Sequence, residues 1–223
     1  MKILVTGGLG YIGSHTAVEL SKNYEIIIVD NLVNSNISNL EGINKISSSN
    51  VIFEKLDLAD LQSVRDLFEK YADIEGIIHF AALKSVKESI HNPISYYNNN
   101  IISLLNILSE IRNRNMNINF VFSSSCTVYG QSENLPISES EPIKTALSPY
   151  GNTKQICEEI LSDYSKIASN FNVTSLRYFN PIGAHESAEI GELPLETPQN
   201  LIPFITQSVA GVRGELTVFG DDY

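Results

Sequence analysis

Tyr150 and Lys154 stand four residues apart, at the start of a segment with a helical pattern. Residues at this spacing lie on one face of a helix, and alone they are also typical of an ordinary surface helix. A phenol with a pKa near ~10 is a poor base at neutral pH. An ammonium ~4 Å away contributes roughly 4 kcal/mol at an effective dielectric of about 20. The pair therefore predicts that Lys154 lowers the pKa of Tyr150, which then acts as a general base and acid.

Ser125 ends the β-rich run 119–125 and is the third candidate for chemistry. A hydroxyl at the carboxyl end of a parallel strand faces the ligand crevice, where it can hydrogen-bond a reacting oxygen and share a proton with Tyr150. The alternative is a serine that only forms a turn. Cys126 is interpreted as a packed thiol and His79 as a satisfied core residue. No metal is expected, because no residues have metal-ligand spacing.

The stretch Met1–Ser14 holds a short apolar run, then glycines at positions 7, 10 and 13, then a helical pattern. Gly7 allows a turn that a side chain would block, Gly10 allows close approach to a pyrophosphate, and Gly13 allows tight packing of the helix on the strand. The helix N-terminus offers N–H donors and a positive dipole end to phosphates. The spacing therefore predicts a dinucleotide site, although glycines also mark ordinary turns.

Two acids follow later strands of the pattern. Asp30 ends the second strand, where a carboxylate accepts hydrogen bonds from an adenosine ribose and repels a 2′-phosphate, so NAD is favoured over NADP. Asp57 ends the third strand and faces either the adenine edge or solvent, as the cap of a helix. The alternative for Asp30 is an acid in a simple turn.

Apolar runs alternate with amphipathic segments, which predicts an α/β fold with a doubly wound, parallel, Rossmann-type sheet. A boundary is expected near residue 180, where Asn180-Pro181 breaks the alternation. Residues 1–180 then form an NAD-binding domain, and residues 181–223 begin a smaller, incomplete substrate-binding region. Residues 31–50 are predicted to be loop with a little helix. The strands after the glycines are predicted at 25–30, 51–57, 76–82, 119–125 and 173–179, and a further strand-like run covers 215–219.

The chain has 223 residues, two cysteines and a formal net charge of −11. The acidic balance disfavours nucleic-acid or anionic-membrane partners. No apolar run has the length of a membrane span, and the start of the chain lacks the pattern of a signal peptide. A cytoplasmic protein without a disulfide framework is expected.

Several motifs together resemble the extended short-chain dehydrogenases/reductases. They are the fingerprint Thr6–Gly13, the serines 123–125 before Val128-Tyr129-Gly130, and the pair Tyr150 and Lys154. Within that family the chain is most similar to the nucleotide-sugar 4-epimerases, which share the motifs Phe80–Val86, Tyr178–Ala184 and Asn200–Pro203.

The resemblance implies an epimerase that interconverts UDP-glucose and UDP-galactose by transient oxidation at sugar C4 with tightly bound NAD, followed by return of hydride to the opposite face. Tyr150, Lys154 and Ser125 match the family's catalytic positions, and Lys154 would also hold the nicotinamide ribose. A UDP-sugar is the implied substrate; the matching positions are Ser125, Tyr150, Asn180, Asn200 and Leu201. The positions that match cofactor contacts are Gly7, Gly10, Tyr11, Ile12, Gly13, Asp30, Asn31, Asp57, Leu58, Phe80, Ala81, Ala82, Lys84, Asn99, Tyr150, Lys154 and Tyr178.

The chain departs from the family at Ala82, where Gly is frequent, and in lacking the last portion that carries much of the uracil and diphosphate site. A dehydratase would need an acid pair after Ser125, and a decarboxylase a Glu, whereas Cys126 and Thr127 stand there. Epimerases for N-acetylhexosamine or pentose nucleotides and a non-catalytic NAD-binding protein stay open as alternatives. By analogy, a homodimer would form through helices matching 98–112 and 150–168.

Overall fold

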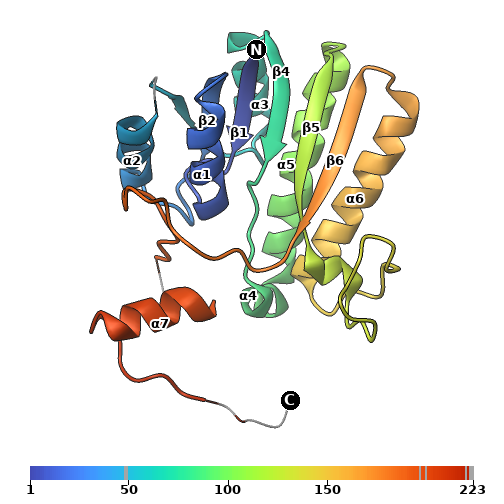
Figure 1. Ribbon diagram of the computed structural model, residues 1–223. Coiled ribbons are helices and arrows are strands. Elements are labelled where there is room, and N and C mark those ends of the chain that lie inside the picture. The colour runs from blue at the N-terminus through green and yellow to red at the C-terminus, as the bar shows by residue number, and fades with distance from the viewer. Residues whose placement is uncertain (48–49, 196, 199, 219, 221–223) are drawn as a thin grey trace.

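Strands and helices alternate along the chain and form one parallel sheet with helices on both faces (Figure 1). The computed structural model describes residues 1–47, 50–195, 197–198, 200–218 and 220. The strand order β3-β2-β1-β4-β5-β6 confirms the predicted doubly wound, Rossmann-type sheet. The strands are β1 (Lys2–Thr6), β2 (Glu25–Asp30), β3 (Ile52–Lys55), β4 (Ile74–His79), β5 (Ile118–Ser125) and β6 (Phe171–Tyr178).

The helices fill the connections between strands, as right-handed crossovers require. The order of the chain reverses between β1 and β4, so loops after the carboxyl ends of these two strands diverge and leave room for a ligand. The helices are α1 (Tyr11–Leu20), α2 (Ser38–Ile46), α3 (Leu61–Lys70), α4 (Val86–His91), α5 (Pro93–Asn113), α6 (Pro149–Ile167) and α7 (Leu201–Val209), and η1 (Cys126–Tyr129) is a short turn of 3-10 helix.

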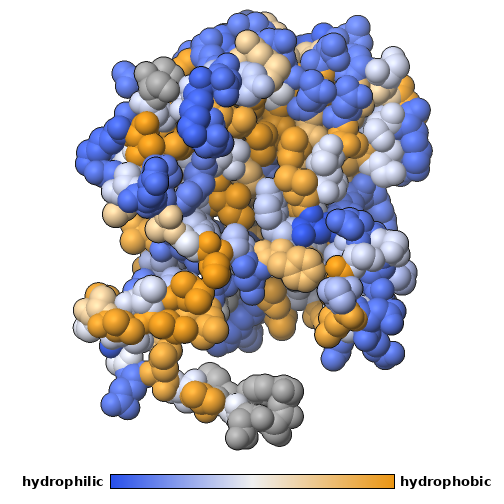
Figure 2. Space-filling view, viewed as in Figure 1, coloured by the Kyte–Doolittle hydropathy of each residue, from blue (hydrophilic) through white to orange (hydrophobic). Residues whose placement is uncertain are grey.

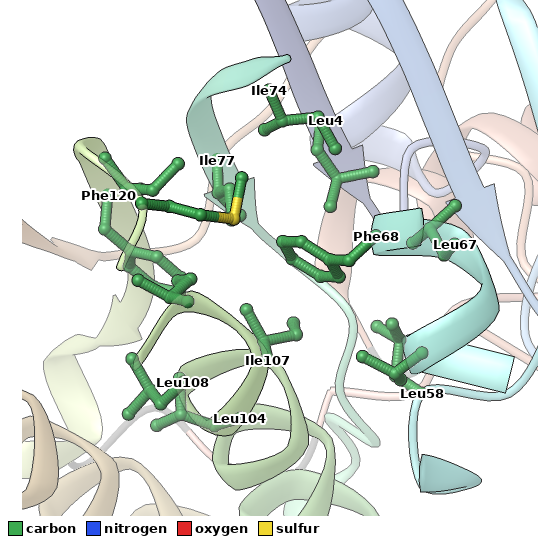
Figure 3. Close-up of a cluster of buried hydrophobic side chains, with 14 of the residues drawn as sticks. Leu4, Leu58, Leu67, Phe68, Ile74, Ile77, Leu104, Ile107, Leu108 and Phe120 are labelled. Carbon is green, nitrogen blue, oxygen red and sulfur yellow. The ribbon is translucent and has the colours of Figure 1, made fainter. Parts of the chain in front are cut away.

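Two hydrophobic cores lie on opposite faces of the sheet. The larger joins the sheet to α3, α5 and α6, and Phe68, Leu104 and Phe120 of this core are at most 1% exposed (Figure 3). The smaller core contains Val18 and Ile28 and joins the sheet to α1 and α2. Since both faces are covered in this way, the strands read as nearly continuous apolar runs in the sequence.

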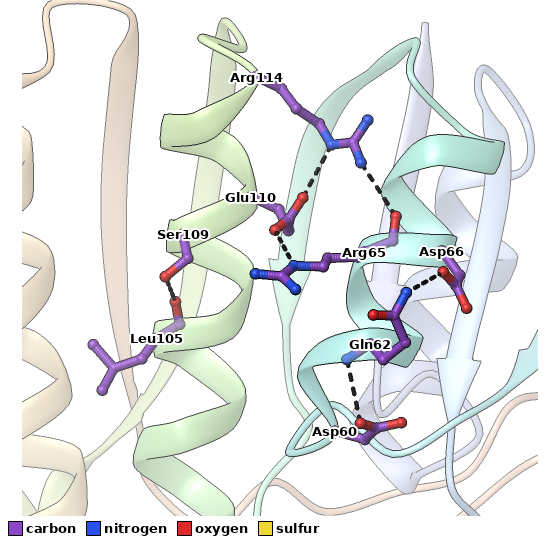
Figure 4. Close-up of polar contacts among 8 residues, drawn as sticks. All are labelled: Asp60, Gln62, Arg65, Asp66, Leu105, Ser109, Glu110 and Arg114. Carbon is purple, nitrogen blue, oxygen red and sulfur yellow. Dashed lines mark hydrogen bonds and ion pairs between the residues drawn. The ribbon is translucent and has the colours of Figure 1, made fainter.

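A buried carboxylate ties α3 to α5 within the larger layer. The Glu110 side chain is 4% exposed and lies 3.5 Å from Arg65 Nε and 3.1 Å from Arg114 Nε (Figure 4). Asp60 caps α3, because its side chain accepts hydrogen bonds from the backbone N–H groups of Gln62 and Ser63. These contacts fix the helices that support the central strands.

Residues 31–50, predicted to be loop with a little helix, contain helix α2 at 38–46, where Ile43 is buried in the smaller core and Asn39 donates to the carbonyl of Leu9 at 2.7 Å. Two local predictions were wrong. The third strand ends at Lys55, so Asp57 follows it in a turn. Residues 215–218 form no strand, because no described strand pairs with them, and Phe219 lies outside the described residues.

After β6 the chain crosses back to α1 and α2 (Figure 1). Ile190 is buried in the smaller core, and Lys45 Nζ lies 2.9 Å from Glu189 Oε2. A Cβ on Gly42 would lie 2.5 Å from the Glu189 carbonyl, so the helix and this segment touch through their backbones. The division into regions at residue 180 stays a prediction.

Helix α7 lies apart from the sheet (Figure 1), and Pro203 is its buried residue. Leu201 and Val209 are 68% and 83% exposed. In Figure 2, apolar surface gathers along this helix and over the central strands. Across the described ranges, no helix is both long enough and apolar enough to cross a membrane.

Candidate active site

The glycine loop between β1 and α1 lies at the carboxyl edge of the sheet. Gly7 has a φ of +64°, and a Cβ there would lie 2.7 Å from the backbone nitrogen of Ala81. A Cβ on Gly13 would lie 2.3 Å from the Gly7 carbonyl oxygen. By contrast, a Cβ on Gly10 would lie 3.2 Å from the Gly7 carbonyl oxygen, and no other described atom beyond its chain neighbours would come within 4 Å of it. Gly7 and Gly13 are therefore required by the fold, whereas the lack of a side chain at Gly10 mainly leaves room at the edge.

Helix α1 begins at this loop without a side-chain cap from any described residue, with Gly10 in the capping position. The first N–H groups of a helix carry a partial positive charge and need acceptors. A pyrophosphate fits this position: it is an acceptor, and Gly10 leaves space for it. The loop can thus hold the phosphates of a dinucleotide despite the net negative charge of the chain.

Asp30 is 8% exposed and ties the glycine loop to the end of β2. Its Oδ2 accepts a hydrogen bond from Leu9 N at 3.1 Å, and its Oδ1 accepts from Leu32 N at 2.9 Å and from Ser35 Oγ at 2.7 Å. A carboxylate has about four lone-pair sites, so Asp30 keeps capacity for a ribose hydroxyl. The next residue, Asn31, accepts from Val33 N at 3.1 Å.

The loop after β4 passes directly over the glycine loop. Thr6 Oγ1 lies 2.8 Å from His79 Nδ1 and accepts from Ala81 N at 3.3 Å. Burial, followed by the charge of Lys154, lowers the pKa of His79 to about 3, so this imidazole is neutral at pH 7. His79 is 1% exposed and hydrogen-bonded, which confirms it as a satisfied core histidine.

Asn100 holds the same loop from α5 and was missed by the sequence analysis. Its side chain accepts from Leu83 N at 2.8 Å and donates to Leu83 O at 3.0 Å and to Thr153 Oγ1 at 3.0 Å. It therefore joins the loop to α6, next to Lys154. The signal in the sequence was an amide at a core-facing position of an amphipathic helix, where an apolar residue is usual.

Ser125 and Tyr150 meet at the end of β5. Helix α6 starts at a cap in which Ser148 Oγ accepts from Gly151 N at 3.1 Å, and Pro149 occupies its first turn. This start sets Tyr150 beside Ser125. Burial raises the pKa of Tyr150, and the hydrogen bond with Ser125 opposes that shift.

Lys154 is 4% exposed and lies one turn along α6 from Tyr150. Its Nζ donates to the Ser123 carbonyl at 2.7 Å and lies 5.9 Å from the Tyr150 ring centroid. Burial lowers the pKa of Lys154 to about 8, against the opposing effects of Cys157 and Glu158. The expectation that Lys154 lowers the phenol pKa was wrong for this structure, because burial raises the pKa of Tyr150 and outweighs the opposing effect of Ser125.

The other predicted cofactor positions differ in their contacts and in their exposure to solvent. Tyr11 donates to the Gly183 carbonyl at 2.7 Å, and the Phe80 and Tyr178 rings are 6.4 Å apart between centroids. Asp57 accepts from Ala59 N at 2.9 Å, and the Leu58 side chain, 4% exposed, belongs to the larger core. Ile12, Ala82 and Asn99 are half-buried on α1, the β4 loop and α5, and the Lys84 side chain is 66% exposed.

The predicted substrate positions beyond β6 are not gathered around Tyr150. Asn180 is exposed after the strand, and Leu201 is exposed at the start of α7. Asn200 donates to Glu192 Oε1 at 2.6 Å. No hydrogen bond among the described residues joins these three to the Ser125–Tyr150 pair.

The cysteines and histidines of the described residues form no further candidate site. Cys126 and Cys157 are free thiols, half-buried and buried. Within the described ranges, no group of three His, Cys, Asp or Glu side chains is arranged to hold a metal ion.

The strand order, the glycine loop and the Ser125–Tyr150–Lys154 group define a nucleotide-binding α/β protein of the short-chain dehydrogenase/reductase class. The family model described as GDP-mannose 4,6 dehydratase matches residues 4–223, and the chain belongs to this family.

Curated relatives in this family are named as epimerases. The chain is 46% identical over 224 residues to the UDP-glucose 4-epimerase of Pasteurella multocida, covering 100% of the chain and 66% of the relative. It is 47% identical over 226 residues to that of Schizosaccharomyces pombe, covering 99% of the chain and 63% of the relative. The chain thus spans less than the full length of both relatives.

Solved structures also match over the whole of this chain. The UDP-glucose 4-epimerase of Bifidobacterium longum, in complex with NAD+ and UDP, matches with a TM-score of 0.95 at 41% identity, covering 100% of this chain and 66% of that chain. The Stenotrophomonas maltophila enzyme, with bound NAD and formylated UDP-arabinopyranose, matches with a TM-score of 0.94 at 44% identity and the same coverage.

Proposed function

We propose that the protein is an NAD-dependent epimerase that interconverts UDP-glucose and UDP-galactose. The observation that carries the proposal is the placement of Tyr150 beside Ser125 at the carboxyl end of β5, with buried Lys154 one turn along α6 and bound to the Ser123 carbonyl. The curated relatives at 46% and 47% identity support the choice of reaction.

In this proposal the chain supplies proton transfer and orientation. Tyr150 removes the proton from the sugar 4-hydroxyl and returns it at the end of the cycle, and Ser125 hydrogen-bonds the same oxygen. NAD, when bound, would supply a nicotinamide that takes the hydrogen from sugar C4 as hydride and returns it to the opposite face of that carbon, which inverts C4. Since the cofactor is regenerated in each cycle, no external reductant is needed.

The residues that would hold NAD are those of the glycine loop and its neighbours. The uncapped start of α1 would hold the pyrophosphate, and Asp30 would accept from the adenosine ribose. Lys154 would hold the nicotinamide ribose. Tyr150 would then lie near the positive charge of the nicotinamide, which would favour the ionised phenol and oppose the effect of burial. We expect the pKa of Tyr150 to fall when the cofactor binds.

The matching family model is described as a dehydratase, whereas the reaction that we propose is an epimerisation. Elimination of water requires an acid beside the hydroxyl of Ser125. Cys126 and Thr127 stand there, and burial raises the pKa of the Cys126 thiol, so it is a poor acid for this role. The residues next to Ser125 therefore favour epimerisation.

A second sugar specificity has support of its own. The UDP-Glc/GlcNAc 4-epimerase of Campylobacter jejuni matches with a TM-score of 0.83 at 37% identity. The fold alone thus does not separate hexose from N-acetylhexosamine substrates, and the test of function includes both.

Further parts of the proposal concern organisation. We assign residues 1–180 to cofactor binding and residues 181–223 to the start of the substrate-binding region.

The protein is cytoplasmic, and two free thiols fit a reducing compartment. A homodimer would use the outer faces of α5 and α6, on which Leu105 is 38% and Ile167 is 77% exposed.

The test is interconversion without added reductant. Purified protein is incubated with UDP-glucose, UDP-N-acetylglucosamine or UDP-xylose, and products are separated by chromatography. NAD is measured by absorbance after denaturation. Formation of UDP-galactose supports the proposal. NAD retention without turnover favours a non-catalytic NAD-binding protein, and turnover of another sugar alone favours a different specificity.

A further inference from the structure

A partly buried ionic network lies directly behind the Ser125–Tyr150–Lys154 group. Ser124 Oγ donates to Glu158 Oε1. Arg177 donates from Nε to Glu158 Oε1 at 3.0 Å and from Nη2 to Oε2 at 2.8 Å. The Arg177 guanidinium carbon lies 4.7 Å from the centroid of the Tyr129 ring. We name Ser124, Tyr129, Glu158 and Arg177 the Glu158 network; it joins β5, η1, α6 and β6, whose ends lie side by side in Figure 1.

Burial makes this network a demanding arrangement. The Glu158 and Arg177 side chains are 10% and 22% exposed, and Ser124 is 2% exposed. Buried charges are tolerated when they are paired and hydrogen-bonded with good geometry, and the bidentate pair meets this condition. Such a pair need not add stability, so its place beside the site invites a second explanation.

The network meets the site at two points. Ser124 lies between Ser123, whose carbonyl accepts from Lys154, and Ser125, whose hydroxyl lies beside Tyr150. The Ser124 side chain points toward α6, where it bonds Glu158. This bond fixes the β5 backbone on both sides of Ser124, and so it fixes the Ser123 carbonyl and the Ser125 hydroxyl. Glu158 also follows Lys154 by four residues on α6, and therefore lies on the same helix face.

Lys154 needs a counter-charge inside the protein. The titratable groups that act on it or feel its charge are His79 from β4 and Cys157 and Glu158 from α6, with Tyr150 one turn earlier. His79 is neutral at pH 7, and burial raises the pKa of Cys157 to about 11, so that thiol is neutral as well. Among these described groups, Glu158 is the one carboxylate, and it is therefore the counter-charge available to Lys154.

We propose that Glu158, held by Arg177 and Ser124, is a positioning residue that keeps Lys154 charged and in place beside Tyr150. Its role in turnover rests on the proposed function, whereas its effect on the charge of Lys154 does not. A purely structural tie between α6 and β6 would leave the titration of Lys154 unchanged, and this difference separates the two roles.

The experiment compares Glu158→Gln with Glu159→Gln. The first keeps shape and an acceptor oxygen but removes the charge; the second removes an equal charge from an exposed position next along the helix. Lysine side chains are labelled with ¹³C, and Lys154 is assigned from a Lys154→Arg variant. We expect the titration of Lys154 to move down by about one unit in Glu158→Gln and to stay in place in Glu159→Gln.

A double variant keeps the test decisive if Glu158→Gln folds poorly. Glu158→Gln leaves the half-buried Arg177 without its carboxylate partner, whereas Glu158→Gln with Arg177→Met removes both charges and should restore the lost stability. The Lys154 titration should still lie below that of the wild type. In active protein, the alkaline limb of the kcat profile should move to lower pH in both variants.

The outcomes are separable. An unchanged Lys154 titration in both Glu158 variants overturns the inference, even if the wild type is a fully active epimerase. A shifted titration in a protein that interconverts no UDP-sugar supports the charge effect and rejects the proposed function.

Discussion

Lys154 donates a hydrogen bond from Nζ to the Ser123 carbonyl oxygen at 2.7 Å, and so this lysine is held by the backbone of β5. The contact places an ammonium at the end of the strand that also carries Ser125. A carbonyl satisfies one of three ammonium donors and leaves the others for a ribose or another acceptor. The relationship links the orientation of α6 to the end of β5.

The first prediction concerns the general base. Tyr150→Phe should reduce kcat by about 10²–10⁴-fold, the usual contribution of acid–base catalysis, because no phenol remains to accept the sugar proton. The variant should retain NAD, since the glycine loop is unchanged. Turnover and bound NAD are measured on the same preparation. Tyr164→Phe, a change on the far end of α6, is the control; near-normal turnover of Tyr150→Phe would rule out the assigned base.

The second prediction separates two glycines of one loop. Gly13→Ala should destabilise the protein by about 1–3 kcal/mol, because its Cβ would meet a backbone oxygen. The added Cβ would lie 2.3 Å from the Gly7 carbonyl oxygen at Gly13 and 3.2 Å from it at Gly10. Gly10→Ala should therefore unfold at nearly the wild-type urea concentration but retain less NAD. Equal NAD content in Gly10→Ala and wild type would contradict the assigned pyrophosphate site.

The third prediction follows from the charge of Lys154. Its pKa is about 8 in the folded protein against 10.5 for the free side chain. Between these values the unfolded chain binds more protons, so stability increases with pH by at most about 1.4 kcal/mol per unit. Urea unfolding at several pH values should show this gain in the wild type and its loss in Lys154→Met. Lys166→Met, at an exposed position of α6, is the comparison, and parallel curves for all three proteins would disprove the effect.

The fourth prediction concerns acid stability. The pKa of buried His79 is about 3, below the ordinary value of 6.5. As pH falls below 6.5 the unfolded state gains a proton that the folded state does not bind, so stability falls by up to about 1.4 kcal/mol per unit. His79→Gln, which can still meet Thr6, should lose less stability between pH 7 and pH 5. The exposed His91→Gln should follow the wild type. A similar loss in His79→Gln would exclude His79 as the cause.

The sequence by itself predicted the parts that depend on local pattern. Continuous apolar runs and helical periodicity were enough for the parallel sheet, because a strand covered on both faces has few other compositions. Glycine spacing and the four-residue spacing of Tyr150 and Lys154 located the candidate site, because both follow from the geometry of one turn and one helix.

Tertiary structure decided what depends on partners distant in the chain. Asn-rich α2 folds because Ile43 enters a core shared with Ile190, which no local propensity reports. The direction of the Tyr150 pKa shift was missed, since burial cannot be read from spacing. The partners of Lys154 and Glu158 come from neighbouring strands, and only the folded sheet brings these groups together in a medium of low dielectric, where their charges influence one another strongly.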